Sequence, residues 1–562
     1  MRHPQRCRTQ TSDQSNQETS VTHAPTAWCL CAGIVPVLNL YQYVFHQTKT
    51  ICAIHETINI LANLSKRMWG LALCICVILL SLPAHAENLL VGFAQHSITP
   101  EIVDVWQDVN DDAQFDPEID TWTDVNGNGR FDPVWIAGFQ KSRAAQGVKD
   151  DLMAVAVVMD DGDSRIAIVA LDTIGLMRKF VLDVRKSVPA TWGIDYLLVH
   201  ATHNHEGPDT QGLWGPSLFN SGVDHAYMVE IKQSILAAVE SAIGNLEPAE
   251  MSSARISTDA GTPIKDKRKP LVIDEDIRAM LFRRPDGSVI GTLVNFGIHV
   301  ELAWDKNLLL TSDIAGYLRR GVSQGIYYDQ KLRMPGLGGT TMWLTGNIGG
   351  LMTSGPSDSV YDVFLREDIT SAGHQKARAF GYGLARSIIK AANQGDFMPS
   401  PTHRLSVRAN EIELGIDNFM LSLATLSGVV DSNPTLHFTP PFVRYLSEVA
   451  FIQLGNTTIT AIPGELYPEI AVGGIENPEG ADYSIPPQEV PSLRSQLPGK
   501  VNLIVNLAND AIGYIIPKSE WDGAAPWIYG EEDETYGEIV SLGPETAPII
   551  HKAVINLLDS DP

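Results

Sequence analysis

Three histidines follow one another closely at the end of an apolar run, in the segment Leu197–Asp209 (LLVHATHNHEGPD). Because side chains alternate between the two faces of a strand, we expect His203 and His205 to point the same way. Two imidazoles at the junction of a buried strand and a loop suit a metal ion or a proton relay. A solvated strand end without chemistry is the alternative that this segment alone leaves open.

Three further junctions between strands and loops carry side chains that can ligate a metal. His299 follows an apolar run, Glu465 follows a Pro-Gly turn, and Tyr514 comes after a third apolar run. A catalytic zinc ion takes a few nitrogen and oxygen ligands and keeps a position for water, whose pKa falls to about 7. Each residue alone is also explained as a core histidine, a turn carboxylate or a packed aromatic, so it is their joint placement that favours a metal.

The elements that must position these side chains alternate between apolar strands and amphipathic helices. We expect strands within 89–100, 154–159, 165–171, 191–202, 280–283, 289–296, 449–454, 457–462 and 501–507, and helices at 224–243, 370–392 and 546–558. No Pro/Ser-rich linker interrupts residues 150–562. This pattern predicts an α/β fold, a single large catalytic domain with layered mixed sheets and flanking helices.

The segment Ser65–Ala86 has a basic start, an apolar core and an Ala-His-Ala ending, which is typical of a secretory signal peptide. We expect Met68 to be the true start, residues 68–86 to be the signal peptide and Glu87 to begin a mature domain of residues 87–562. Residues 1–67 then form an upstream extension to which we assign no fold. The apolar core is too short for an ordinary membrane span, so we expect no span in the mature chain and a periplasmic or secreted location.

Cysteine and charge content narrow the class of the exported part. All six cysteines precede residue 87, which excludes a disulfide scaffold, a thiol nucleophile and a lipid anchor on cysteine. Residues 87–562 contain 35 Lys and Arg against 63 Asp and Glu, a net charge of −28. Nucleic acid is therefore not an expected partner, and attraction to an anionic bilayer is disfavoured. The oligomeric state does not follow from the sequence.

An acidic repeat lies in the segment 105–133. DVNDDAQFD and DVNGNGRFD match at an offset of sixteen residues and place oxygen side chains at positions 1, 3, 5 and 9, namely Asp108, Asn110, Asp112 and Asp116, then Asp124, Asn126, Asn128 and Asp132. Calcium favours such oxygens in a tight loop. Ile119 and Trp135 replace the bidentate glutamate of an EF-hand, so we expect compact structural calcium loops. A solvated acidic loop is the alternative.

Six segments, in chain order, resemble the neutral/alkaline (non-lysosomal) ceramidase family, which comprises zinc amidases that hydrolyse N-acylsphingosine. They are VGFAQHSITP, ATHNHEGPD, LVNFGIHVE, AIPGELYPE, LANDAIGYIIPKSEW and TYGEIVSLGPET, spread over residues 89–545 or so. The resemblance implies a ceramidase-like fold and a small-molecule or lipid amide substrate. It also implies an enzyme in which metal-bound water attacks the amide carbonyl.

The resemblance further implies a role for each matching residue. His203, His299, Glu465 and Tyr514 would ligate zinc, whereas His205 and Tyr536 would stabilise the developing oxyanion. The resemblance assigns no base; the candidates are the metal-bound hydroxide itself and Glu206, which follows His205 directly. An arginine near position 268 is not carried over, because its spacing differs from that of the family.

The sequence also departs from the family. Gly350 and Met352 occupy the positions of a family aspartate and of a serine important for activity, and a thioether can neither accept an acyl group nor donate a hydrogen bond. Ser354 lies two residues further on. About 17 residues follow the last motif, which leaves no room for the family's C-terminal immunoglobulin-like domain. Two alternatives therefore stay open: an inactive ceramidase-like binding protein, and a zinc hydrolase of a different ester or amide.

Overall fold

The computed structural model describes residues 89–217, 220–258 and 264–559. These residues belong to one compact unit that spans His85–Pro562. The expected extension 1–67 and signal peptide 68–86 lie outside the described residues, and both stay predictions.

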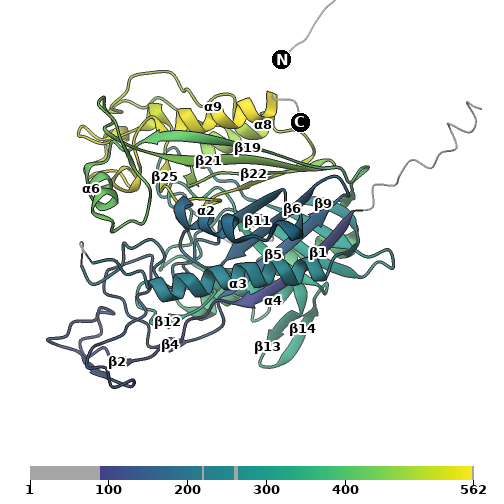
Figure 1. Cartoon of the computed structure of the whole chain (residues 1–562), viewed down its shortest axis with the longest axis horizontal. Helices are drawn as coiled ribbons and strands as arrows, with labels where there is room; N and C mark the ends of the chain where they lie inside the picture. The colour runs from purple at the N-terminus through teal and green to yellow at the C-terminus, as the bar shows by residue number, and fades with distance from the viewer. Residues whose placement is uncertain (1–88, 218–219, 259–263, 560–562) are drawn as a thin grey trace, which may run out of the picture. The chain divides into compact units, whose positions relative to one another are not determined.

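The first sheet has the strand order β7-β6-β5-β1-β8. Its strands are β1 (Leu90–Ser97), β5 (Met153–Asp160), β6 (Arg165–Leu171), β7 (Tyr196–Ala201) and β8 (Glu247–Pro248). Both faces of β5 and β6 are buried, which explains why they read as nearly continuous apolar runs. The helices α2 (Arg178–Ser187) and α3 (His225–Gly244) cover the outer face of this sheet (Figure 1).

The helix α3 confirms the expectation for residues 224–243. The side chain of Asp224 accepts hydrogen bonds from the backbone N–H groups of Ala226 and Tyr227, as an N-cap does. The helix is amphipathic as expected, and its apolar side, which includes Ile231 and Ile235, is buried against the sheet.

The second sheet has the strand order β15-β11-β10-β9-β18. Its strands are β9 (Glu250–Ser257), β10 (Asp276–Arg283), β11 (Val289–Phe296), β15 (Thr340–Thr345) and β18 (Met398–Pro399). The strands β10 and β11 confirm two of the expected strands, and they pair antiparallel. The helices α4 (Asp313–Ser323) and α5 (His374–Gln394) pack on the outer face. The helix α5 begins four residues later than the apolar pattern predicted, behind Gly373.

The third sheet has the strand order β19-β21-β22-β24, and β20 (Thr435–Leu436) pairs with β21. Its other strands are β19 (Leu405–Gly415), β21 (Val443–Leu454), β22 (Thr457–Ala461) and β24 (Val501–Val505). The helices α7 (Pro468–Val472), α8 (Leu493–Gln496) and α9 (Thr546–Asp559) cover one face. The other face joins the inner faces of the first two sheets in one core, where Phe93, Met280 and Ile452 belong to the same cluster.

The remaining elements are short and connect these layers. They are β2 (Val105–Gln107), β3 (Thr121–Thr123), β4 (Gly147–Val148), η1 (Ala190–Trp192), β12 (Leu309–Leu310), β13 (Gly325–Tyr328), β14 (Lys331–Pro335), β16 (Val360–Asp362), β17 (Glu367–Ile369), α6 (Phe419–Ser427), β23 (Glu465–Leu466), β25 (Tyr514–Ile515), η2 (Lys518–Glu520), η3 (Ile528–Gly530) and η4 (Glu538–Val540).

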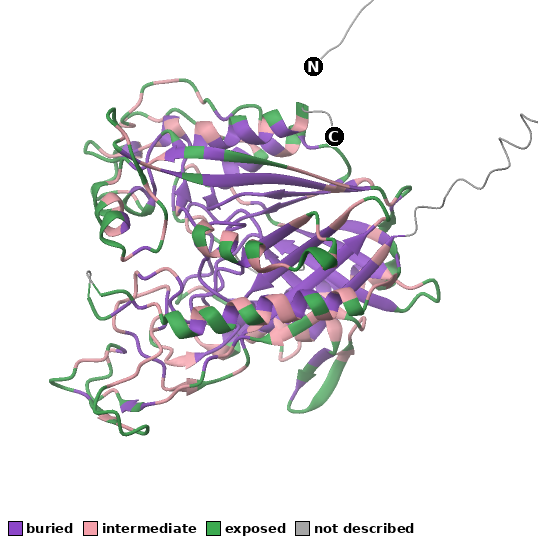
Figure 2. Cartoon of the chain, viewed as in Figure 1, coloured by how far each residue is buried: buried purple, intermediate pink, exposed green. Residues whose placement is uncertain are grey.

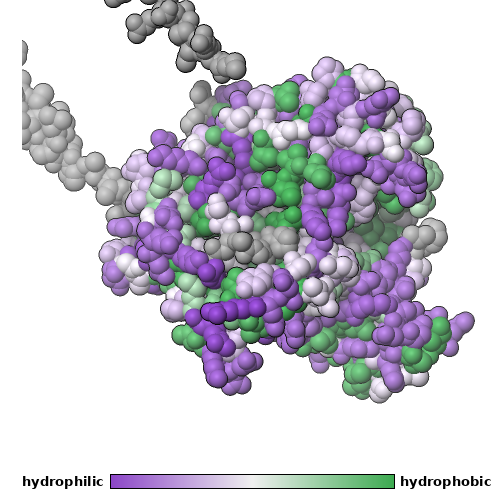
Figure 3. Space-filling view, turned by 180° about the vertical axis from the view of Figure 1, so that it is seen from behind, coloured by the Kyte–Doolittle hydropathy of each residue, from purple (hydrophilic) through white to green (hydrophobic). Residues whose placement is uncertain are grey.

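The burial pattern agrees with a layered α/β protein. Figure 2 shows that the large sheets are buried almost throughout, whereas the covering helices are buried only on one side. The face in Figure 3 is mainly hydrophilic, with hydrophobic side chains gathered towards the middle of its upper part. Among the residues that the structure describes, no helix combines the length and the apolar character that a membrane span requires. The predicted fold class, a mixed-sheet α/β architecture, is confirmed.

Candidate metal centre

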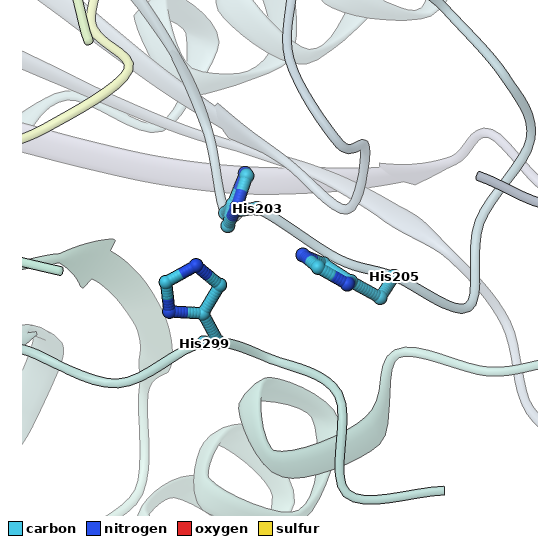
Figure 4. A group of neighbouring side chains, drawn as sticks. All are labelled: His203, His205 and His299. Carbon is cyan, nitrogen blue, oxygen red and sulfur yellow. The ribbon is translucent and has the colours of Figure 1, made fainter. Parts of the chain in front are cut away.

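His203 and His205 lie in the loop that follows β7, not in the strand itself. The strand ends at Ala201, and His203 has a left-handed backbone with φ 61°. We expected the alternation of side chains along a strand to point both rings the same way. This explanation was wrong, because neither histidine is in the strand. The rings nevertheless meet, with centroids 4.7 Å apart, and His299 from the loop after β11 lies 4.8 Å from His203 (Figure 4).

The main chain orients two of these imidazoles. The Nδ1 atom of His203 lies 2.8 Å from the carbonyl oxygen of Ile174, and the Nδ1 atom of His299 lies 3.0 Å from that of Met352. A carbonyl oxygen only accepts hydrogen bonds, so each Nδ1 carries the proton and each Nε2 presents a lone pair. A metal-ligating histidine commonly donates its other ring N–H to a main-chain carbonyl oxygen in this way, which fixes the orientation of the ring.

Glu465 and Tyr514 reach the same point from a two-stranded element. The strands β23 and β25 run parallel, with Glu465 opposite Tyr514 in the register. The Oε2 atom of Glu465 lies 3.5 Å from Nε2 of His203 and 3.2 Å from Nε2 of His299, and it has no hydrogen-bond partner although it is buried. The hydroxyl of Tyr514 lies 3.3 Å from Nε2 of His299.

These distances suit a single metal ion. Ligand atoms about 2.0–2.1 Å from a tetrahedral ion lie about 3.4 Å from one another. The distances from Oε2 of Glu465 to the Nε2 atoms of His203 and His299 match this ligand–ligand distance. The potential ligand atoms of His203, His205 and His299 also form a group, and they lie within 4.8 Å of one another. These three histidines could therefore hold a metal ion together.

Burial and charge set the protonation of the cluster. Burial, together with the nearby His299, lowers the pKa of His203 to about 4, although Glu465 opposes the shift. Burial raises the pKa of Glu465, but His203 and His299 outweigh it and the net shift is downward. For His299 burial acts downward and the carboxylates of Glu465 and Glu301 produce a net upward shift of the pKa. A neutral His203 beside an ionised Glu465 is the state that metal binding needs.

Glu301 is a member of this cluster that sequence reasoning missed. Its Oε2 atom lies 3.1 Å from Nδ1 of His205 without the angles of a hydrogen bond, and its Oε1 atom accepts from the hydroxyl of Thr353. Burial, reinforced by His203 and His299, lowers the pKa of His205 well below its usual value. The available signal was its place two residues after His299 in the LVNFGIHVE segment.

The six residues expected at the zinc site all line one cavity of about 170 Å³. They are His203, His205, His299, Glu465, Tyr514 and Tyr536. Most of the remaining wall is apolar and includes Met177, Trp214, Leu421, Val430 and Leu507. The polar cluster therefore lies at one side of a largely hydrophobic chamber, an arrangement typical of a small-molecule site.

Tyr536 stands at the mouth of this cavity, with 48 % of its surface exposed. Its ring centroid lies 5.5 Å from that of Tyr514. Arg268 holds the backbone here, because its guanidinium donates to the carbonyl oxygen of Tyr536 and forms a two-pronged ion pair with Glu538. We assigned no role to Arg268 from the family resemblance. The structure shows that it positions the loop that carries Tyr536.

Glu206 does not reach the cavity. Its carboxylate is fully buried, accepts from the side chain of Asn307 and pairs with Arg143 at 3.4 Å. Arg143 in turn donates to the carbonyl oxygens of Ala137 and His205. Glu206 and Arg143 therefore brace the histidine loop from behind, and Glu206 is not placed as a base.

Residues 350–354, where the sequence departs from the family motif, lie against His299. The Met352 side chain packs in an apolar cluster with Met177 and Leu507, while its carbonyl oxygen accepts from the backbone N–H of His299 and orients its ring. Ser354 is buried, and its hydroxyl has no hydrogen-bond partner. Neither Met352 nor Ser354 lines the cavity.

The acidic insert folds into two adjacent loops around the short pair β2 and β3. The carboxylates of Asp108 and Asp124 each accept backbone N–H groups within their own loop, and the amides of Asn126 and Asn128 donate to Asp132. In the described ranges, the only group of three or more converging His, Cys, Asp or Glu ligands is the histidine cluster. The calcium assignment stays a prediction.

Comparisons with known proteins point to one fold. No protein-family model matches the sequence, and no curated protein matches it. A solved structure of neutral ceramidase from Pseudomonas aeruginosa superposes with a TM-score of 0.57 at 14% sequence identity, covering 84% of this chain and 74% of that chain. A ceramidase complexed with C2 superposes with a TM-score of 0.58 at 14% identity, covering 84% and 75%. The fold is therefore ceramidase-like, as the sequence motifs predicted.

Proposed function

We propose that this chain is an exported, zinc-dependent hydrolase of an N-acyl amide bond in a ceramide-like substrate. The observation that carries the proposal is the convergence of His203, His299 and Glu465 on one point at the side of an apolar cavity. The ceramidase-like fold supports the amide as the bond, and the apolar wall suits an acyl chain.

Zinc is supported by the donor set. Two imidazole nitrogens, one carboxylate and one phenol are ligands of the kind that zinc takes, and the buried Glu465 oxygen has no other partner. Zinc, when bound, polarises an amide carbonyl and lowers the pKa of a coordinated water to about 7.

His205 and Tyr536 would stabilise the charge that develops on the carbonyl oxygen. Desolvation raises the pKa of Tyr536, so its hydroxyl stays protonated and can donate a hydrogen bond. Figure 4 shows the distal nitrogen of His205 directed towards His203 and His299. A neutral His205 carries its proton on that nitrogen, and can donate from it, when Nδ1 accepts a hydrogen bond from a protonated Glu301 carboxyl.

The replacement at Met352 favours one second candidate, a ceramidase-like protein that binds a lipid amide without hydrolysing it. In this case the cavity and the metal site would persist while turnover is absent. A third candidate, a zinc hydrolase of another amide or an ester, shares the metal site and differs only in the substrate.

The test combines metal analysis with hydrolysis of N-acylsphingosine, soluble N-acyl amides and esters. The purified chain is expected to hold about one zinc ion and to lose hydrolysis on chelation. His203→Ala should lose both zinc and activity, whereas His205→Ala should keep zinc and lose about a hundredfold or more in kcat. The exposed His225→Ala is the matched control.

The outcomes separate the candidates. Zinc retained at full content in His203→Ala would sink the ligand assignment. Full zinc content without turnover of any amide or ester would favour the binding protein, and turnover of esters or other amides alone would favour the third candidate.

Calcium in the acidic insert is a structural part of the same proposal. A carboxylate has about four lone-pair sites, so Asp108 and Asp124 can accept backbone N–H groups and still face a cation. Terbium luminescence excited through the nearby tryptophans, including Trp122 on β3, checks this: calcium should displace the signal, and Asp124→Asn should weaken it.

A further inference from the structure

The segment 418–443 is unusually poor in charge for this acidic chain. It contains one formal charge, Asp431, and one histidine, His437. The Asp431 carboxylate is paired with the ammonium of Lys179. The segment therefore presents almost no net charge to its surroundings. The whole chain, by contrast, carries 66 acidic residues against 41 basic ones.

The same segment exposes large apolar side chains. The helix α6 is apolar around most of its circumference (FMLSLATLS), yet of its residues only Thr425 is fully buried. Seven large apolar residues of the segment are exposed, namely Phe419, Met420, Leu423, Leu426, Leu436, Phe438 and Phe442. Among the described residues, all three exposed phenylalanines fall here. We call these seven side chains the apolar rim.

The apolar rim continues directly into the cavity. Leu421 and Thr425, on the inner side of α6, line the chamber that holds the histidine cluster, as do Val430 and Ser432 further along. The amide of Asn418, the N-cap of α6, donates to the carbonyl oxygen of Ile539, itself an exposed residue close to Tyr536 at the mouth. One face of this segment is thus cavity wall, and the other is exposed apolar surface.

We propose that the apolar rim docks on an uncharged lipid surface, a zwitterionic bilayer, and admits the substrate from it. An exposed apolar patch of this kind marks an interaction site, and a helix that is apolar around most of its circumference is normally buried, in a protein core or in a membrane. The missing charge favours a zwitterionic surface over an anionic one, from which a chain with net charge −25 is repelled. This inference rests on the proposed lipid amide substrate, because it explains how that substrate reaches the cavity without crossing water.

The test is co-sedimentation of the full chain with phosphatidylcholine vesicles, in parallel with hydrolysis of a soluble N-acyl amide. The wild-type chain should sediment with the vesicles, and added phosphatidylserine should weaken binding. Phe438→Ser with Phe442→Ser should lower vesicle affinity at least about tenfold and leave soluble hydrolysis unchanged, because neither side chain lines the cavity.

The matched control is Tyr327→Ser with Leu332→Ser. These two exposed apolar residues lie on the β13–β14 hairpin, which projects well away from α6 (Figure 1). The control should bind vesicles like the wild type. An unchanged Tm in both double variants shows that folding is intact.

Several outcomes would overturn the inference. The first is that the wild-type chain does not bind vesicles, and the second is that the rim variant binds them as tightly as the wild type. The third is that the apolar rim forms a dimer interface. In the last case the chain sediments as a dimer in buffer and the rim variant as a monomer. If the chain hydrolyses the soluble amide but does not bind vesicles, the docking proposal is refuted and the proposed enzymatic activity stands. If the chain binds vesicles but hydrolyses no substrate, the proposed enzymatic activity is refuted and the docking proposal stands.

Discussion

At the scale of single residues, the site depends on how each imidazole uses its second nitrogen. His203 and His299 spend Nδ1 on main-chain carbonyl oxygens, which leaves Nε2 as a lone-pair donor beside Glu465. His205 differs, because its Nδ1 faces the Glu301 carboxyl. A carboxyl that donates to Nδ1 keeps a proton on Nε2, whereas a carboxylate that accepts from Nδ1 removes it. Once the two groups align in a hydrogen bond, the protonation of Glu301 would determine whether His205 can donate to an oxyanion.

Substitution of Glu301 tests this role. Burial raises the pKa of Glu301 although His299 and Thr353 oppose the shift, which favours the protonated, donating form. Glu301→Ala is expected to reduce kcat about tenfold to a hundredfold with unchanged zinc content. Glu301→Gln should retain most of the activity, since its amide can donate to His205 and accept from Thr353. A glutamine variant as inactive as the alanine variant would show that the negative charge is required instead.

At the scale of elements, the candidate metal centre is assembled where sheets end. The loop after β7 in the first sheet supplies His203, and the loop after β11 in the second supplies His299. The small parallel pair of β23 and β25 adds Glu465 and Tyr514. Such junctions can carry polar side chains into the interior because the strands behind them are apolar and fully packed.

Two buried carboxyl groups, one on α7 and one in η2, lead us to predict how the free energy of unfolding varies with pH. Glu469 on α7 and Glu520 in η2 are both buried, and burial raises the pKa of both carboxyls, that of Glu520 to about 7. The folded state then binds protons that the unfolded state releases above its ordinary pKa near 4.5. The stability present at and below that pH is therefore lost as the pH rises towards 7 and beyond.

Glu520→Gln should flatten this loss. The free energy of unfolding of the wild type is expected to decline by about 3 kcal/mol more than that of the variant between the two pKa values. Denaturant unfolding at a series of pH values measures the difference, with the exposed Glu534→Gln as the control. Parallel pH profiles for wild type and Glu520→Gln would contradict the assignment.

At the scale of the whole molecule, three sheets share one core and each is covered by helices on its outer side. A ligand held between loops of different sheets therefore ties together parts that are distant in the sequence. Any species that binds the folded state alone adds to its stability. Zinc at the proposed site is consequently expected to affect unfolding as well as chemistry.

Chelation should lower the Tm of the wild-type chain. A metal at a thousandfold excess over its Kd contributes about 4 kcal/mol, which corresponds to several degrees in a unit of this size. Thermal unfolding followed by circular dichroism with a zinc chelator, and then with zinc restored, measures the shift. His203→Ala should not respond to either addition. A wild-type Tm that is indifferent to chelator would argue against a tightly bound ion.

The sequence by itself determined the local elements, the fold class and the candidate residues. Apolar runs such as β5 and β6 are legible because buried strands need no polar face, and Asp224 marks the start of α3 because free N–H groups there require a cap. Ordered motifs singled out six side chains of the cavity, although nothing in the chain's linear order states that they meet.

Only the tertiary structure decided the distances and the partners. It brought the ring of His205 beside that of His203, gave it Glu301 and not Glu206 as the nearby buried carboxyl, and placed Arg268 behind Tyr536. These facts depend on loops from different sheets packing together, which no local pattern encodes. Local propensity thus specifies which residues can do chemistry, and long-range packing specifies which of them share a proton or an ion.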